Sequence, residues 1–137
     1  MQHILCDGGK AQAGINDDNN CTVRALAITA GISYKKADAI ATEAGRKRNE
    51  GFEPFKLMRS VRKNGIKARK ICCGQQSLKQ FLKSYPKGRY WTCTTDHAFA
   101  IIDGVIYDTL KLRPQTKVVG AFKIPSQRLD LIKSRLV

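Results

Sequence analysis

The sequence lacks the features that would send a chain through a membrane or fold it around a metal ion. No apolar run approaches the length of a membrane-spanning helix, and the N-terminus has no apolar signal-peptide core. No Cys-x-x-Cys motif is present, and the His3–Cys6 spacing has no second ligand pair that would complete a zinc site. We therefore expect no metal, no cofactor and no membrane partner.

Acidic residues are also scarce. The 137 residues include 25 Lys and Arg against 11 Asp and Glu, which gives a net charge of +14. Such a charge either belongs to a merely basic soluble protein or favours an anionic partner: nucleic acid, an anionic membrane surface or an acidic protein. The five cysteines are odd in number and include the adjacent pair Cys72-Cys73. This usage indicates a reducing compartment, so we expect a cytoplasmic protein.

Residues 1–137 are predicted to form one α+β domain without internal repeats or linkers. Residues 1–18 are expected to be an irregular entry loop. Helices are predicted over residues 20–30, 33–44, 54–64, 77–85 and 126–137, and strands over 66–73, 89–95, 97–102, 105–109 and 116–124. The order of these elements, with helices before a mostly antiparallel sheet, is typical of the α+β class.

Cys21 lies in the first turn of the first predicted helix, which ends at Gly31. Asn19 or Asn20 is the expected N-cap, because its side-chain oxygen can accept a free backbone N–H. The positive end of the helix dipole favours the thiolate, which is the nucleophilic form. An isolated cysteine in a helix is more often a small buried apolar residue. A catalytic interpretation therefore needs a second group.

That second group is His97, at the start of a predicted strand. The dipeptide Asp103-Gly104 between two apolar runs predicts a two-residue hairpin turn. Such a turn pairs Phe99 with Asp108, and this pairing places Asp108 on the His97 face of the sheet, diagonal to the imidazole. A diagonal pair is within reach of these side chains. We therefore predict that Asp108 orients His97.

Cys21, His97 and Asp108 together have the composition of a catalytic triad. The thiol would attack a carbonyl, the imidazole would take and return its proton, and the carboxylate would hold the imidazole tautomer. A buried histidine at a strand end is more often structural, but an aspartate on the same face raises the odds of a functional role. We predict that these three residues form the catalytic site.

The three segments that carry these residues resemble the papain-like cysteine peptidase fold. In that fold a cysteine opens an early helix, and a histidine and an aspartate or asparagine begin later strands; the matching segments here are 20–27, 96–101 and 104–109. The runs Cys21–Ala27 and Ala44–Arg48 are similar to runs in small uncharacterised bacteriophage proteins of this type. The His-to-Asp spacing is similar to that of bacteriocin-processing peptidases. The resemblance covers residues 15–125.

This resemblance implies a phage-encoded cysteine hydrolase or peptidase that acts on an amide or isopeptide bond in the host cytoplasm. The same scaffold also supports acyl transfer and deamidation. The implied partner is a protein or peptide substrate, and the positive charge favours an acidic one.

The expected oxyanion donors depart from the pattern of such enzymes, which often place a glutamine several residues before the cysteine. Gln12 is nine residues before Cys21, which is far. Asn16 or Asn19 could substitute, and the backbone N–H of Cys21 is a further candidate donor.

The charged loop from Arg46 through Lys47 and Arg48 to Gly51 has two interpretations. It is either a solvated connector or a contact for an anionic substrate, and charge clusters in loops are commonly the former.

A second hypothesis is that the protein has no catalytic activity. The chain would then be a catalytically idle papain-like fold that serves as a basic binding module for nucleic acid or a host protein. The net charge of +14 favours this alternative, because a peptidase does not need it. A nucleic-acid module usually interleaves aromatic with basic residues, and only Arg89-Tyr90-Trp91 does so conspicuously in this sequence.

Overall fold

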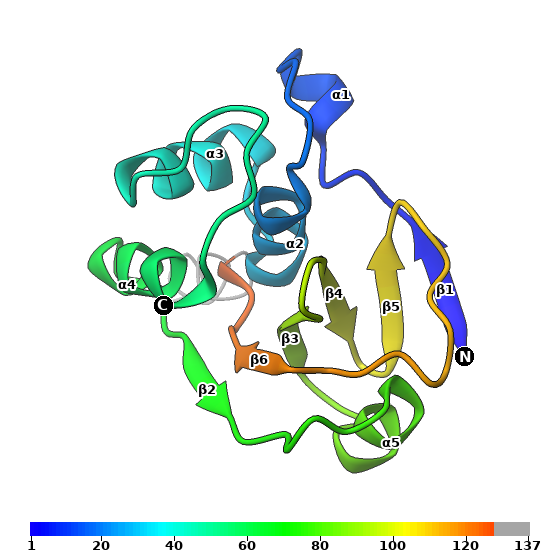
Figure 1. Cartoon of the computed structure of the whole chain (residues 1–137). Helices are drawn as coiled ribbons and strands as arrows, with labels where there is room; N and C mark the ends of the chain where they lie inside the picture. The colour runs from blue at the N-terminus through cyan, green and yellow to red at the C-terminus, as the bar shows by residue number, and fades with distance from the viewer. Residues whose placement is uncertain (128–137) are drawn as a thin grey trace, which may run out of the picture.

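A six-stranded sheet and five helices make up the fold in the computed structural model, which describes residues 1–127 (Figure 1). The helices are α1 (Lys10–Ala13), α2 (Cys21–Ala30), α3 (Tyr34–Glu43), α4 (Pro54–Lys63) and α5 (Leu78–Ser84). The strands are β1 (Gln2–Leu5), β2 (Arg69–Ile71), β3 (Arg89–Cys93), β4 (Ala98–Ile102), β5 (Val105–Asp108) and β6 (Gly120–Lys123). The predicted α+β class is confirmed.

The strands lie in the order β1-β5-β4-β3-β6-β2, and every neighbouring pair is antiparallel except β1 with β5. The β4–β5 hairpin has the predicted register, because Ile102 pairs with Val105. Asp103 and Gly104 both have positive φ, at 48° and 77°, as a type I′ turn requires. The local turn chemistry therefore fixes which side chains share a face of these two strands.

Each face of the sheet has its own apolar core. On one face α2, α3 and α4 bury a cluster around Leu26, Met58, Trp91 and Phe122. On the other face, Phe81 of α5 packs in a second cluster with side chains of β2 to β6. The sheet is therefore covered on both sides, and its central strands β3 and β4 are buried.

Helix α2 is the central helix of the larger core. Its small residues allow a close approach to the sheet, and most of its length is buried. Trp91 Nε1 donates a hydrogen bond to the Thr22 carbonyl at 3.2 Å, which anchors the start of the helix to β3. Arg89 donates to the Ile28 and Thr29 carbonyls at 2.9 and 2.7 Å, which satisfies the end of the helix. Both ends of α2 are thus fixed to one strand.

Residues 1–18 are not wholly an irregular loop, which corrects the prediction for this segment. Residues 2–5 form β1, which pairs in parallel with β5 at the edge of the sheet, and α1 follows after Gly9. Ile4 and Leu5 remain exposed in β1. Because the strand is short and half-solvated, it has no clear alternation in the sequence.

Two predicted strands are shorter than expected, and one predicted element is not described. The strand predicted over 66–73 is limited to β2, at the sheet edge, and the strand predicted over 116–124 is limited to β6. The helix predicted over 126–137 lies, apart from residues 126 and 127, outside the described residues. None of the helices within residues 1–127 is both long enough and apolar enough to cross a membrane.

Candidate active site

The fold brings Cys21, His97 and Asp108 to one edge of the sheet. Cys21 is the first residue of α2, His97 immediately precedes β4, and Asp108 is the last residue of β5. Because β4 and β5 are antiparallel, the start of one and the end of the other lie at the same edge, and the N-terminus of α2 reaches this edge (Figure 1). Three segments far apart in the sequence therefore supply one site.

His97 and Asp108 are joined by a short hydrogen bond. His97 Nε2 lies 2.6 Å from Asp108 Oδ2, as the diagonal geometry of the hairpin predicts. The carboxylate is buried, and its other oxygen, Oδ1, accepts a hydrogen bond from the Thr109 N–H at 2.7 Å. The imidazole also stacks on Phe99, with the rings inclined by 22°. These contacts hold the ring in one orientation.

The pKa of His97 is raised to about 9. The hydrogen bond to Asp108 is the largest cause, followed by the interaction with Cys21, and both outweigh the opposing effect of burial. The charged imidazolium is therefore the favoured form near neutral pH.

The pKa of Cys21 moves in the complementary direction, below its ordinary value. Burial acts to raise this pKa. Hydrogen bonds with His97 and with the backbone of Ala98, together with the positive charges of His97 and Arg24, lower it by more than burial raises it. A lowered thiol pKa beside a raised imidazole pKa favours a thiolate–imidazolium pair. Since Asp108 occupies Nε2 of the ring, Nδ1 is the nitrogen left to face the thiol.

The start of α2 is not capped by a side chain, which corrects the prediction for Asn19 and Asn20. Asn20 occupies the N-cap position, but its amide donates to the Tyr34 hydroxyl at 3.0 Å and its Oδ1 accepts from Arg24. The Asn20 carbonyl accepts the backbone N–H groups of Val23 and Arg24.

As a result, the backbone N–H groups of Cys21 and Thr22 have no hydrogen-bond partner among the described residues. Unpaired N–H groups at a helix N-terminus suit a developing negative charge.

The two asparagines predicted as oxyanion donors lie elsewhere. Asn19 Nδ2 donates to the Asn49 carbonyl at 3.2 Å, which directs the amide toward the loop over 46–51. Asn16 is exposed and lines a pocket of about 460 Å³ together with Arg24 and Thr109, but Cys21 does not line this pocket. The first-turn backbone is thus the better-placed donor.

Arg24 is a site residue that the sequence reasoning did not assign. Its Nη2 lies 3.8 Å from Asp108 Oδ1, and its charge helps to lower the pKa of Cys21. A spacing of three residues places Arg24 on the same face of α2 as Cys21, and this spacing was the available signal. The guanidinium therefore connects the helix to the carboxylate.

The predicted anion contact does not hold for Arg46, because this side chain is only 1% exposed. It forms a bidentate ion pair with Asp17, at 2.8 and 3.1 Å. Asp17 also accepts hydrogen bonds from the Asn49 N–H at 2.7 Å and the Tyr34 hydroxyl at 3.3 Å. The Asp17–Arg46 ion pair therefore holds the loop over 46–51 against the segment before α2.

The other two cations of that loop are at the surface. Arg48 is 49% exposed and lies 3.0 Å from Asp38, which pairs part of its charge. Lys47 is exposed, and within residues 1–127 no ion pair involves it. Of the three predicted anion contacts, Lys47 is thus the most available.

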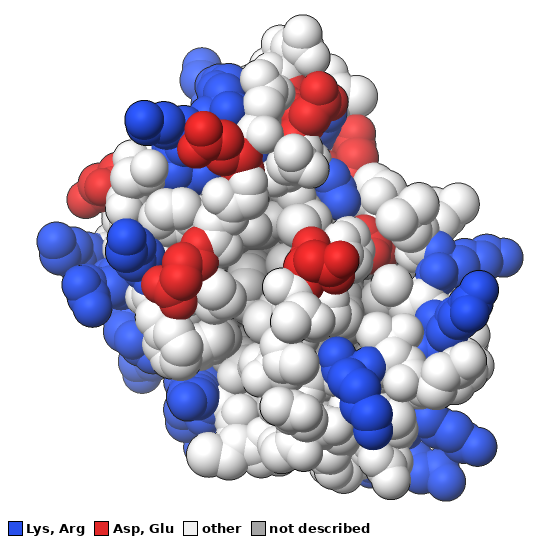
Figure 2. Space-filling view, viewed as in Figure 1, with Lys and Arg blue, Asp and Glu red and all other residues white. Residues whose placement is uncertain are grey.

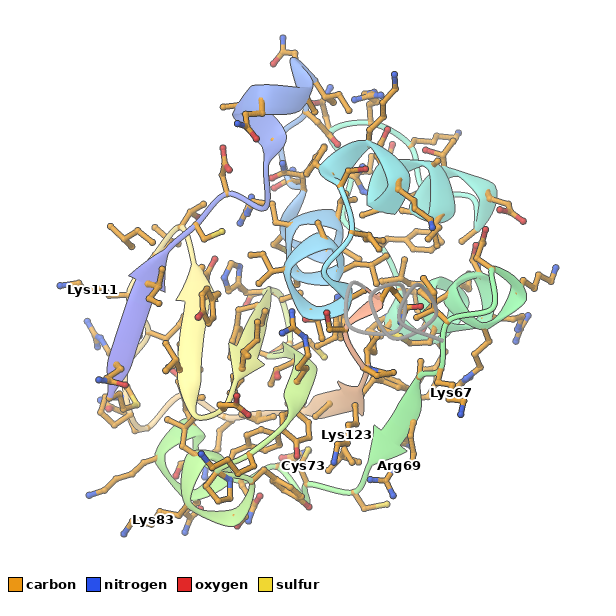
Figure 3. The ribbon with its side chains drawn as sticks, turned by 180° about the vertical axis from the view of Figure 1, so that it is seen from behind. Lys67, Arg69, Cys73, Lys83, Lys111 and Lys123 are labelled. Carbon is orange, nitrogen blue, oxygen red and sulfur yellow. The ribbon has the colours of Figure 1, made fainter. Side chains whose placement is uncertain are left out.

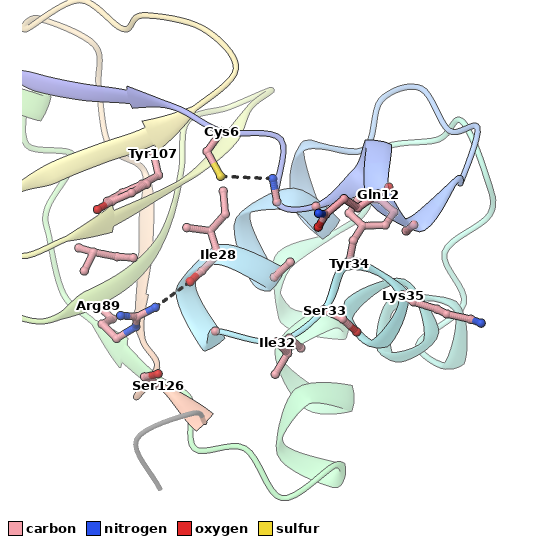
Figure 4. Close-up of a pocket in the computed structure, with 16 residues that line it drawn as sticks. Cys6, Gln12, Ile28, Ile32, Ser33, Tyr34, Lys35, Arg89, Tyr107 and Ser126 are labelled. Carbon is pink, nitrogen blue, oxygen red and sulfur yellow. Dashed lines mark hydrogen bonds between the residues drawn. The ribbon is translucent and has the colours of Figure 1, made fainter. Parts of the chain in front are cut away.

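A sizeable pocket lies away from these catalytic candidates. It has a volume of about 810 Å³ and is lined by the C-terminal half of α2 with Cys6, Tyr34, Arg89 and Tyr107 (Figure 4). None of the three predicted triad residues lines it. Volume alone would therefore misplace the site.

Charge is unevenly distributed around the molecule. In Figure 2, Lys and Arg side chains lie mainly along the margins, whereas acidic side chains lie nearer the middle of that face.

In the part of the chain that the structure describes, no group of three or more His, Cys, Asp or Glu side chains could hold a metal ion.

A scan against protein-family models, a search of curated proteins and a search of solved structures each found no match.

Proposed function

We propose that the protein is a thiol hydrolase of papain-like type that cleaves an amide or isopeptide bond, with Cys21 as the nucleophile. The single observation that carries this proposal is the position of His97 between the Cys21 thiol and the Asp108 carboxylate. The chain order of cysteine, histidine and aspartate, with the cysteine at a helix N-terminus, supports the papain-like assignment. The resemblance of its sequence runs supports a bacteriophage source.

The first half of the reaction acylates Cys21. The thiolate attacks the carbonyl carbon of the substrate while Nδ1 of His97 holds the thiol proton. The backbone N–H groups of Cys21 and Thr22 stabilise the oxyanion. His97 then gives its proton to the leaving amine, the carbon–nitrogen bond breaks, and a thioester remains on Cys21.

The second half releases the acyl group. His97 is now neutral and takes a proton from water, whose oxygen attacks the thioester carbonyl. The carbon–sulfur bond breaks, the product leaves as a carboxylic acid, and the thiolate–imidazolium pair is restored. An amine in place of water would give acyl transfer from the same intermediate. Asp108 keeps the imidazole oriented throughout both halves of the reaction.

The acyl-enzyme provides a test that needs no knowledge of the natural substrate. p-Nitrophenyl acetate releases a coloured product when it acetylates a reactive thiol, and mass spectrometry locates the acetyl group. We expect a burst of one equivalent with acetate on Cys21 and slow turnover afterwards. The variant Cys21→Ala should lose the burst, whereas Cys72→Ala, which removes an exposed thiol, should retain it. Acetylation spread over all exposed thiols, unaffected by Cys21→Ala, would contradict the proposal.

A further inference from the structure

The excess positive charge is concentrated in one stretch of the chain. Residues 54–95 contain eleven Lys and Arg and no Asp or Glu, although the whole chain has a net charge of only +14. This stretch supplies α4, β2, α5 and β3. The remaining residues have nearly equal numbers of positive and negative charges. Most of the positive electrostatic field of the protein therefore comes from residues 54–95.

Part of this stretch forms a surface at the end of the sheet, which we call the basic edge. It consists of Arg62, Lys67, Arg69 and Lys70, with Lys123 from the neighbouring strand β6 and the aromatic residue Phe55. Arg69 pairs with Lys123 on one face of β2 and β6, whereas Lys70 pairs with Phe122 on the other face, beside Phe55. The basic edge therefore wraps around the outer strand of the sheet, and Figure 3 shows Lys67, Arg69 and Lys123 around these two strands.

Acidic side chains do not neutralise the cations of the basic edge in the described part of the chain, although Arg62 donates two hydrogen bonds to the Ala68 carbonyl. All five are exposed, and none forms an ion pair with any residue of the described range. Arg62, Lys67 and Arg69 also line a shallow pocket of about 410 Å³. Five exposed cations, three of them around this pocket, favour a ligand with several negative charges.

Phe55 adds a second kind of contact. Its side chain is 56% exposed on α4, although its ring edge packs against Phe122 at 6.1 Å between centroids. Lys70 Nζ lies 5.1 Å from the centre of the same ring. Lysines on an edge strand can simply prevent sheets from joining, but that role does not require an exposed aromatic ring.

We propose that the basic edge binds single-stranded nucleic acid. Cations that track the phosphates and an exposed ring that stacks on a base are the two contacts that single strands use. A duplex keeps its bases stacked inside, so it could use the cations but not Phe55. This chemistry therefore favours a single strand over a duplex, a membrane surface or an acidic protein.

The basic edge is separate from the candidate active site. Strand β2 is four strand spacings from β5, which is about 19 Å at the usual separation of strands. Binding at the basic edge therefore does not depend on Cys21 chemistry, and a Cys21→Ala variant should bind the probe as the wild type does.

The test is fluorescence anisotropy with a labelled oligothymidylate of about 15 nucleotides, near the upper site size of small single-strand-binding domains. The variant Lys67→Gln/Arg69→Gln/Lys123→Gln removes three phosphate contacts. We expect it to reduce the slope of log affinity against log salt by about 2, at roughly 0.7 per contact. Phe55→Leu should keep the slope and weaken binding about tenfold, because only stacking is lost.

A matched control removes the same charge elsewhere. Lys79→Gln/Lys83→Gln/Lys111→Gln changes exposed lysines, and Figure 3 shows Lys111 near β1 and Lys83 near α5, away from Lys67 beside β2. This variant should keep the wild-type slope and bind within about twofold. Equal losses in both triple variants, equal binding of a duplex, or binding only to vesicles that contain phosphatidylserine would each overturn the proposal. Circular dichroism checks that every variant is folded.

Discussion

Cys21 and Cys93 are both largely shielded from solvent, yet their pKa values move in opposite directions. Burial raises the pKa of Cys93 to about 11, and the nearby Cys73 and Cys21 add to this effect. Burial also acts on Cys21, but His97 and the Ala98 backbone reverse the outcome. The neighbours of each thiol, rather than its exposure, therefore decide which of the two has the lowered pKa.

Replacing Asp108 by Asn tests the role of the carboxylate charge, because the asparagine side chain has nearly the same size and shape. The variant loses the largest cause of the raised His97 pKa, so less imidazolium is present to stabilise the Cys21 thiolate. We expect the burst with p-nitrophenyl acetate to slow by about 100-fold or more. Unchanged burst kinetics in a folded Asp108→Asn protein would show that the carboxylate has no catalytic role.

The same pair predicts a pH dependence of stability, best measured in a Cys21→Ala background where the thiol does not titrate. The folded pKa of His97 is raised above its ordinary value near 6.5, mainly by Asp108. The resulting stabilisation is complete below about pH 6.5 and is lost as the pH rises through the folded pKa. Urea denaturation at several pH values should therefore show a larger loss over this window than in Cys21→Ala/Asp108→Asn. Parallel curves would contradict the assignment.

Arg24 provides a third test at the residue scale. Its charge lowers the pKa of Cys21 and lies near Asp108. We expect Arg24→Gln to raise the pH at which Cys21 becomes reactive, with little change in the maximal rate at high pH. A uniform loss of rate at every pH would instead indicate a structural role.

Among the elements, the α2 N-terminus depends on buried polar contacts that lie outside the helix. Asn20 bonds to Tyr34, Tyr34 bonds to Asp17, and Asp17 holds Arg46. These contacts are made by side chains up to 29 residues apart. They fix the segment that leads into Cys21 and connect it to the loop over 46–51.

Removing one partner of the Asp17–Arg46 pair should be costly, because it leaves a buried charge without compensation. We expect Arg46→Met to lower the free energy of unfolding by about 3–5 kcal/mol. Asp17→Asn/Arg46→Met should lose less than the two single variants together. Arg48→Ala, at a half-exposed pair, should cost at most about 1 kcal/mol. Equal losses in Arg46→Met and Arg48→Ala, from denaturant titrations, would contradict this ranking.

Local chemistry explains which elements the sequence could predict. The dipeptide Asp103-Gly104 is enough to specify a two-residue turn, and this turn sets the hairpin register. Because side chains alternate between the two faces of a strand, that register predicted the His97–Asp108 contact. Asn20 occupies the predicted N-cap position, but its predicted side-chain cap is absent because Arg24 and Tyr34 bind its amide, which no local pattern reveals. Strand β1 was missed because its partner lies about 100 residues away.

At the scale of the whole molecule, two separate surfaces share one small fold. The candidate active site lies where α2 meets β4 and β5, whereas the basic edge lies at the opposite end of the sheet (Figure 1). Net charge read from the sequence indicates an anionic partner but not its location. The buried Arg46 and the exposed Lys67 contribute equally to that sum, although only one of them can meet a ligand.

The most direct test of the central claim is the rate at which iodoacetamide alkylates each cysteine, mapped by mass spectrometry from about pH 5 to 9 in wild type and His97→Ala. Cys21 should react rapidly near pH 6, far below the ordinary thiol pKa of about 8.5, and His97→Ala should abolish that reactivity while exposed Cys72 is unaffected. If Cys21 is inert, or follows the same pH profile as Cys72 with and without His97, no thiolate–imidazolium pair exists and the proposed hydrolase is wrong.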